Sequence, residues 1–202
     1  MDATNSQAFG YSKNLPENIR AIVARLCKNV AALQYKWDFY LTLFSSKQNF
    51  DLWGELGLGS SFHVIEESLR FDITMAIFRL NDGDGRNLSI ANLVKKCRNV
   101  SELNALFAQF QKACKPIIEH RHTLVGHEDT DTALKPREHP ILRVHEKQIT
   151  MILILAAKIL NTIFKHYGSD ALDFHIVPQG GADELLYWLN DGKLRHLDKF
   201  SA

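Results

Sequence analysis

Apolar residues recur at steps of three and four along four stretches of the chain that contain neither glycine nor proline. The stretches are residues 17–53, 60–82, 86–115 and 141–167. In the first, the apolar series runs from Ile19 to Phe44. Stretches of this kind could in principle be strands, but steps of three and four residues return to one face of a helix. Their length and period therefore predict an all-α protein.

The residues that flank these stretches predict where the helices begin and end. Pro16 lies just inside the start of the first helix, where its missing N–H costs nothing. The turn sequence NDGDG, residues 81–85, ends the second helix. The last helix is expected from near His145 to Tyr167, with Gly168 as its C-cap. Its β-branched run ITMILIL resembles a strand, but the following residues keep helical spacing, which favours a helix.

The third stretch predicts a short helix over residues 88–97 and a longer one from near Ser101. Pro116 lies within the longer helix, and it either kinks the helix or starts a new segment that runs to about Val125. Together the elements predict an all-α bundle of four to five helices with a short C-terminal helical tail.

The length of 202 residues fits one domain with an appendage. We expect a flexible N-terminus over residues 1–14, a helical bundle over 15–167 and an extension over 168–202. The extension contains one short predicted helix, Ala182 to Leu189. Residues 128–143, rich in Asp, Thr, Pro and charge, are expected to form a loop.

Composition excludes several classes of protein. Hydrophobic residues make up 46% of the chain and charged residues 23%, which excludes wholesale disorder. The net charge of +1 excludes a strongly basic, histone-like binder but not a local basic site. The three cysteines include no CxxC pair, which excludes zinc ribbons and thioredoxin-type sites and suits a reducing cytoplasm.

We expect neither a signal peptide nor a membrane span. The N-terminus has no apolar core. The most apolar run, residues 149–157, has about half of the roughly 20 residues that a membrane span needs. The expected location is the cytoplasm.

Histidines cluster where a helix ends and the longest loop begins. Five of the nine fall within residues 119–147, where an average density would give about one. The five are His120, His122, His127, His139 and His145. Three interpretations stay open: a metal site, metal-free chemistry on a phosphate, and a polar helix end whose histidines cap carbonyls or face water.

Metal binding is the less favoured of the two chemical interpretations. His120 and His127 are seven residues apart, which places them on one face of an uninterrupted helix. The chain has no HExxH motif, and His127 is followed by Glu128 rather than by the aspartate of metal phosphohydrolases. We therefore expect no metal and no other cofactor.

Arg121 and His127 supply the groups that metal-free RNA cleavage requires. An arginine holds a phosphate bidentately and stays charged, and a histidine exchanges a proton near neutral pH. The histidine would remove the proton of a ribose 2′-OH, whose oxygen attacks the neighbouring phosphorus, and the arginine would offset the growing negative charge. Six residues apart on an ideal helix, the two side chains point about 120° apart. Gly126 can end the helix and let His127 turn back.

An arginine followed after four to six residues by a histidine, at the end of a helix in an all-α bundle, resembles the motif of the HEPN superfamily (higher eukaryotes and prokaryotes nucleotide-binding). The residue after the arginine is polar, His122, as is usual in that family. The order of elements is similar to the abortive-infection U-type branch. A long helix precedes one ending in FRLNDGDG, followed by RNLSIANLVKKC, a helix carrying RHTLVGHED and a last apolar helix. The resemblance covers about residues 15–167.

The resemblance implies a metal-independent endoribonuclease of a toxin–antitoxin or phage-defence system, or of RNA processing. Members are typically homodimers whose motifs face each other across the interface. Carried over to this chain, Arg121 would bind phosphate and stabilise the transition state, His127 would be the general base or acid, and His122 would orient them. Many members are inactive, so the alternative is a silent module that binds RNA, nucleotide or a protein partner such as an antitoxin.

Two departures from the family pattern follow His127. Some HEPN toxins carry a tyrosine two residues after the histidine, where an antitoxin modifies them, but this chain has Asp129. The carboxylates of Glu128 and Asp129 would also repel an RNA phosphate. They would alternatively raise the pKa of the histidine or hold its ring in one tautomer.

Asp72 and a group of aromatic residues are further candidates. Asp72 lies at the edge of the apolar face of the second helix. It is either a buried carboxylate that supports Arg121 or His127, or an exposed residue paired within its own helix. Four aromatic residues are too many for one core stripe: Tyr35, Trp37, Phe39 and Tyr40. Base stacking is one use for them, but a dimer interface or packing of the tail is favoured.

Overall fold

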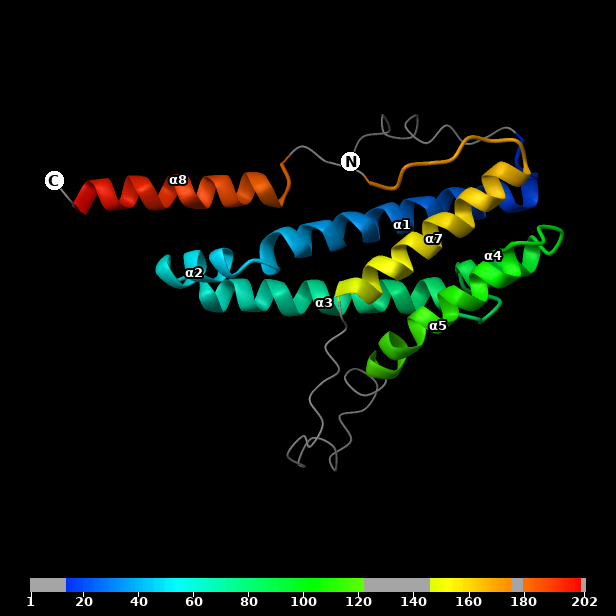
Figure 1. The fold of residues 1–202 in the computed structure, drawn as a ribbon, viewed down its shortest axis with the longest axis horizontal. Coiled ribbons are helices and arrows are strands. Elements are labelled where there is room, and N and C mark those ends of the chain that lie inside the picture. Colours follow the sequence, from blue (N-terminus) through cyan, green and yellow to red (C-terminus); the bar gives the residue numbers. More distant parts are fainter. Residues whose placement is uncertain (1–13, 122–145, 176–179, 201–202) are drawn as a thin grey trace, which may run out of the picture. The chain divides into compact units, whose positions relative to one another are not determined.

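The computed structural model describes residues 14–121, 146–175 and 180–200. These residues form seven helices and no strand (Figure 1). The helices are α1 (Glu17–Phe44), α2 (Lys47–Glu55), α3 (Gly59–Asn81), α4 (Ile90–Lys96), α5 (Leu103–Arg121), α7 (Glu146–His166) and α8 (Ala182–Phe200). The predicted all-α fold is confirmed.

The helices build two compact units. Unit 1 comprises Met1–Ala32 and Thr74–Phe174, and unit 2 comprises Leu33–Ile73 and His175–Ala202. Unit 1 therefore contains the first half of α1, the end of α3 and all of α4, α5 and α7. Unit 2 contains the second half of α1, all of α2, most of α3 and α8.

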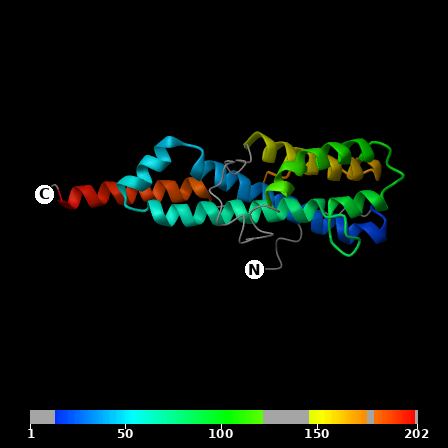
Figure 2. The ribbon, with the colours of Figure 1, turned by 90° about the horizontal axis from the view of Figure 1, so that it is seen from below.

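Helices α5 and α7 pack side by side in unit 1 and run in opposite directions (Figures 1 and 2). Gln148, in the first turn of α7, donates from its Nε2 to the carbonyl oxygen of Ala113 on α5 at 2.8 Å. The side chains of Phe110, Cys114 and Ile117 are fully buried along α5. Nine residues of α7 are buried as well: Ile149, Ile152, Leu153, Leu155, Ala156, Ile159, Leu160, Ile163 and Phe164.

By length and composition, α7 could also cross a membrane. The helix has 21 residues, whereas the apolar run considered in the sequence, residues 149–157, covers only part of it. No other helix in the described part of the chain passes this test. Half of its most apolar window is buried within the protein. The core helix of a soluble bundle has the same length and composition, so this feature alone does not make α7 a membrane span.

Unit 2 has a core rich in aromatic side chains. Its buried members are Leu43, Phe44, Leu52, Trp53, Phe62 and Ala182. Trp53 stacks on Phe62 with ring centroids 4.3 Å apart, and Phe44 meets Trp53 edge-on at 5.0 Å. α8 contributes Ala182 and packs Leu186 against this cluster. The C-terminal helix is therefore part of the core of unit 2.

The first predicted stretch is divided into two helices. α1 ends at Phe44, where the apolar series ends, but α2 then follows after two serines. Asn49 of α2 donates from its Nδ2 to the carbonyl oxygens of Thr42 at 2.7 Å and Leu43 at 3.1 Å, so it satisfies the last carbonyls of α1. Neither glycine nor proline marks this break, which is why the spacing of those residues did not predict it.

The tail helix is longer than predicted. The expected end was Leu189, but α8 continues to Phe200. The ammonium group of Lys193 pairs with the carboxylate of Glu55 on α2, one turn beyond the expected end. Gly192 costs a helix about 1 kcal/mol relative to alanine, and the packing of α8 on unit 2 offsets this cost.

Two predicted helix boundaries are confirmed. Gly168 has a φ of +69°, and the N–H of Ser169 donates to the carbonyl of Phe164 at 2.9 Å, as in a Schellman C-cap. The NDGDG sequence forms a loop in which the carboxylate of Asp82 accepts from the backbone N–H of Asp84 at 2.9 Å. The predicted boundaries at residues 14 and 167 between domain and appendages stay a prediction.

Candidate functional site

The candidate catalytic motif begins at the end of α5. Arg121 is the last described residue of that helix. His122 and His127 lie outside the described residues, as do Gly126 and the loop predicted over 128–143. The expected convergence of Arg121 and His127 therefore stays a prediction.

Packing holds the backbone on both sides of the motif. The chain leaves α5 at Arg121 and enters α7 at Glu146. The hydrogen bond from Gln148 to Ala113 ties the first turn of α7 to α5 about two turns before Arg121. Because the two helices run in opposite directions, Arg121 of α5 and the start of α7 lie at the same end of this helix pair (Figure 1).

Pro116 lies inside α5, and the helix continues through it to Arg121. Of the two predicted roles, the start of a new segment is therefore wrong. Proline cannot donate to the carbonyl of Lys112, and its ring pushes against that carbonyl. The buried side chains of Cys114 and Ile117 on either side of it favour a continuous helix.

Asp72 is half-exposed rather than buried. Its side chain is 42% exposed, and its carboxylate pairs with the ammonium group of Lys36 across from α3 to α1. Neither predicted environment is observed, since the partner comes neither from the motif nor from the same helix. Asp72 belongs to unit 2 and Arg121 to unit 1. A supporting role for Asp72 in the motif stays a prediction.

The surplus aromatic residues of α1 are largely accounted for by packing. Trp37 is buried and stacks on Tyr40 with ring centroids 5.3 Å apart. Phe39 and Tyr40 pack against the core of unit 2, to which α8 also contributes. The hydroxyl of Tyr40 also donates to the carboxylate of Glu66 at 3.3 Å. Phe39 and Tyr40 therefore share a core with the tail helix, which favours the tail-packing interpretation for these two residues.

The three cysteines are not candidate nucleophiles. All three are buried and unpaired. Burial raises the pKa of the Cys27 and Cys114 thiols to about 12 and also raises that of Cys97. Because the thiolate is the reactive form, these side chains are inert near neutral pH.

Within the described residues, no three His, Cys, Asp or Glu side chains gather where they could hold a metal ion. The described structure gives no position for the side chains of the histidine cluster. The expected absence of a metal at the motif therefore stays a prediction.

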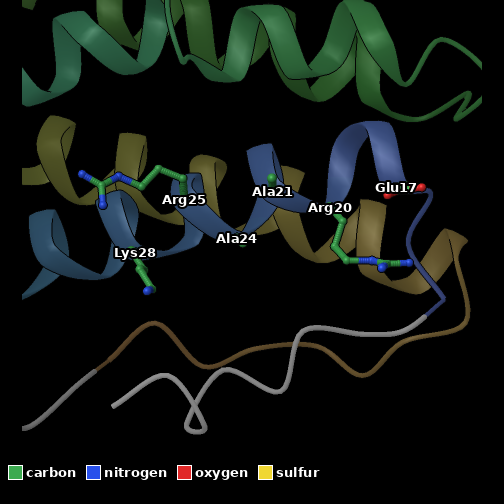
Figure 3. A pocket seen from close by; sticks show the side chains of 6 residues that line it. All are labelled: Glu17, Arg20, Ala21, Ala24, Arg25 and Lys28. Carbon is green, nitrogen blue, oxygen red and sulfur yellow. The ribbon is translucent and has the colours of Figure 1, made fainter. Parts of the chain in front are cut away.

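A hollow of about 460 Å³ lies along α1, open to solvent (Figure 3). Its lining is Glu17, Arg20, Ala21, Ala24, Arg25 and Lys28. The guanidinium of Arg20 is occupied locally, because its Nε and Nη2 donate to the carbonyl of Leu15 at 3.2 and 2.8 Å. The lining has no histidine, cysteine or carboxylate pair, so we assign no chemistry to this hollow.

Sequence reasoning missed two contacts that shape the surroundings of the candidate residues. One is the ion pair of Asp72 with Lys36, and the other is the hydrogen bond from Gln148 to Ala113. Both join helices that are distant in sequence, so spacing within one helix carries no signal for them. Gln148 is the third of three consecutive polar residues at the start of α7, so its residue type alone carried no signal.

Comparison with known protein families gives one match. The HEPN family described as AbiU2 matches residues 16–184, from the start of α1 to the first turn of α8. The match extends beyond residue 167, where the sequence resemblance was expected to end. No curated protein and no solved structure gives a significant match. With this match and its all-α fold, the chain belongs to the AbiU2 family of HEPN domains.

Proposed function

We propose that this protein is a metal-independent endoribonuclease of a phage-defence or toxin–antitoxin system in the cytoplasm. The observation that carries the proposal is membership of the AbiU2 family together with a single Arg–His motif whose arginine lies on α5. The link of the family to abortive infection supports the defence role. An antitoxin or other partner protein would restrain the enzyme in the uninfected cell.

Catalysis would need only protein side chains and the RNA itself. His127 accepts the proton of a ribose 2′-OH as its oxygen attacks the adjacent phosphorus. The new O2′–P bond forms while the P–O5′ bond breaks, and the leaving oxygen takes up a proton. Arg121 binds the phosphate and offsets the charge that develops on it. His122 orients the pair, Asp72 supports them, and two copies of the chain bring their motifs together.

Incubation of the purified protein with total RNA in EDTA tests this proposal. We expect cleavage by the wild type and none by Arg121→Ala or His127→Ala, because each substitution removes one of the two catalytic groups. His63→Ala is a matched control, since His63 is exposed on α3 and faces Glu67 at 3.8 Å. Cleavage that requires a divalent metal, or that survives both motif substitutions, would overturn the proposal.

A catalytically silent HEPN module is the second candidate. The carboxylates of Glu128 and Asp129 next to His127 favour it, because they repel a phosphate. Such a module would bind RNA, nucleotide or a protein partner without cleaving RNA. Expression in cells separates the two candidates. Toxicity that is lost in His127→Ala, with folding and mass unchanged, supports the nuclease, and equal growth of both strains supports the silent module.

A further inference from the structure

The net charge of the chain is only +1, but its two units carry net charges of opposite sign. Unit 1 contains 18 Lys and Arg against 13 Asp and Glu, a net charge of +5. Unit 2 contains 6 against 10, a net charge of −4. Of the 11 large apolar side chains that are exposed in the described part of the chain, eight belong to unit 2. Unit 2 therefore combines acidic charge with exposed apolar surface, which suits a protein partner and not an RNA.

α8 carries the most concentrated part of this surface. One side of the helix packs on the core of unit 2 through Ala182 and Leu186. The side chains of Tyr187, Trp188 and Leu194 are nevertheless 63%, 57% and 61% exposed. A helix that is apolar on more than one side is normally covered on each of them, and exposed aromatic residues are enriched at interfaces. The AbiU2 match ends at residue 184, so most of α8 lies beyond the matched residues.

Acidic residues border the exposed aromatic pair of α8. Asp183 and Glu184 lie in the first turn of the helix, and both side chains are exposed. The carboxylate of Glu184 accepts a long hydrogen bond from Nε1 of Trp188 at 3.5 Å. We call Asp183, Glu184, Tyr187, Trp188 and Leu194 the α8 face. Its charge and its aromatic centre require an occupant that is both basic and apolar.

Unit 1 presents a surface of that kind on α7. Lys147, Met151, Ile154 and Lys158 follow one another at steps of four, three and four, and all four side chains are exposed. They form one stripe on the helix, about 17 Å long at 1.5 Å per residue, with an apolar centre and a lysine at each end. Neither lysine has an ion-pair partner among the described side chains. We call these four residues the α7 stripe.

We propose that the α8 face binds the α7 stripe of a second copy of this chain. Two α7 stripes facing each other would oppose lysines, and two α8 faces would oppose carboxylates. The α7 stripe on the α8 face pairs opposite charges around a shared apolar centre. Each copy carries both surfaces, and in a closed dimer the same contact is made twice. The inference rests on the dimer in the proposed function and not on RNA cleavage.

A charge swap between two variants tests the contact. Lys147→Glu with Lys158→Glu makes the α7 stripe acidic, and Asp183→Lys with Glu184→Lys makes the α8 face basic. We expect the wild type to be a dimer at micromolar concentration in sedimentation velocity and each double variant alone to be a monomer. An equimolar mixture of the two variants should regain the dimer mass, because both contacts in the mixed pair again join opposite charges. Lys112→Glu, an exposed lysine of α5, is the control and should remain a dimer.

Carboxylates in the first turn stabilise a helix, so Asp183→Lys with Glu184→Lys could also weaken α8 itself. A second pair of variants tests the contact without changing these carboxylates. Tyr187→Ser with Trp188→Ser should also give a monomer, with the helical circular dichroism signal kept. Val64→Ser with Phe71→Ser removes equally exposed apolar groups from α3 and should leave the dimer intact.

Several results would overturn the inference. They are a monomeric wild type, dimers that survive either charge reversal, and a mixture that stays monomeric. An α7 reversal that lowers RNA binding by gel shift but keeps the dimer mass would assign the stripe to RNA instead. The RNA cleavage assay is read separately, so a failed contact and a failed nuclease are distinguishable.

Discussion

Burial gives the cysteines a measurable effect on stability at high pH. The pKa of Cys27 and Cys114 rises from 9.0 to about 12 on folding, because the folded interior disfavours the thiolate. The unfolded chain ionises these thiols above pH 9 and the folded chain does not. The free energy of unfolding is therefore unaffected by these thiols below pH 9. It falls as the pH rises from 9 toward 12, by about 1.4 kcal/mol per pH unit for each thiol. Urea denaturation at a series of pH values measures the fall.

The control for this prediction is Cys27→Ala. The variant should be less stable at every pH because it leaves a small cavity. Its free energy of unfolding should also decline less steeply above pH 9 than that of the wild type. Equal slopes for the two proteins would contradict the assignment to Cys27.

Removing the ion pair of Asp72 with Lys36 from either side tests whether Asp72 only stabilises the fold or also supports the motif. Both side chains are partly exposed, so the pair contributes about 0.2–1 kcal/mol. Asp72→Asn and Lys36→Met remove the same ion pair and should lower the free energy of unfolding by similar amounts in urea. If Asp72 supports the motif, only Asp72→Asn lowers the rate of RNA cleavage. Equal cleavage by both variants would limit Asp72 to the ion pair.

At the scale of helices, two glycines should respond in opposite ways to alanine. Gly168 ends α7 with a φ of +69°, which costs an alanine about 1–2 kcal/mol. Gly192 lies within α8, and a Cβ there would meet no atom within 4 Å. Gly168→Ala should therefore lower the melting temperature, and Gly192→Ala should stabilise α8 by about 0.5–1 kcal/mol. A stabilising Gly168→Ala would show that the cap does not need the left-handed conformation.

Helix periodicity predicted the elements whose apolar faces repeat over several turns. The series from Ile19 to Phe44 gave the extent of α1, and Gly168 gave the end of α7, because both signals are local in sequence. The start of α2 and the full length of α8 were not predicted. Asn49 hydrogen-bonds to a carbonyl of α1 and Lys193 pairs with Glu55 of α2, so both contacts join different helices. Periodicity describes one helix at a time and carries no information on such contacts.

The candidate site was only partly accessible from sequence for the same reason. The helical position of Arg121 follows from local signals, and the structure places this residue on α5. The pairing of Asp72 with Lys36 depends on how α1 and α3 pack, and neither sequence-based alternative included it. The roles of His122 and His127 depend on chain geometry beyond α5 and stay predictions.

At the scale of the whole molecule, the core of unit 2 depends on the C-terminal helix. Ala182 is buried in the aromatic cluster, and Leu186 packs against it. Removal of residues 182–202 would expose Trp53 and Phe62 to water. We expect amide hydrogen exchange to accelerate in α2 while α5 and α7 keep their protection, because those helices pack within unit 1.

Asn190→Ala is the control for that truncation. Its side chain is exposed on α8 and lies outside the α8 face, so protection of α2 should match the wild type. Uniform acceleration in both units after truncation would show that the two cores unfold together. Unchanged exchange in α2 would show that the cluster does not need α8.

The apolar character of α7 has a consequence for synthesis on the ribosome. A nascent segment of this length and composition is a target for the membrane-insertion machinery and for aggregation before the bundle closes. Its packing partner α5 precedes it in the chain and leaves the ribosome first. The entropic cost of joining two helices separated by 24 residues grows only with the logarithm of that separation. The order of the two helices therefore lets α7 be covered as it emerges, without waiting for a later element.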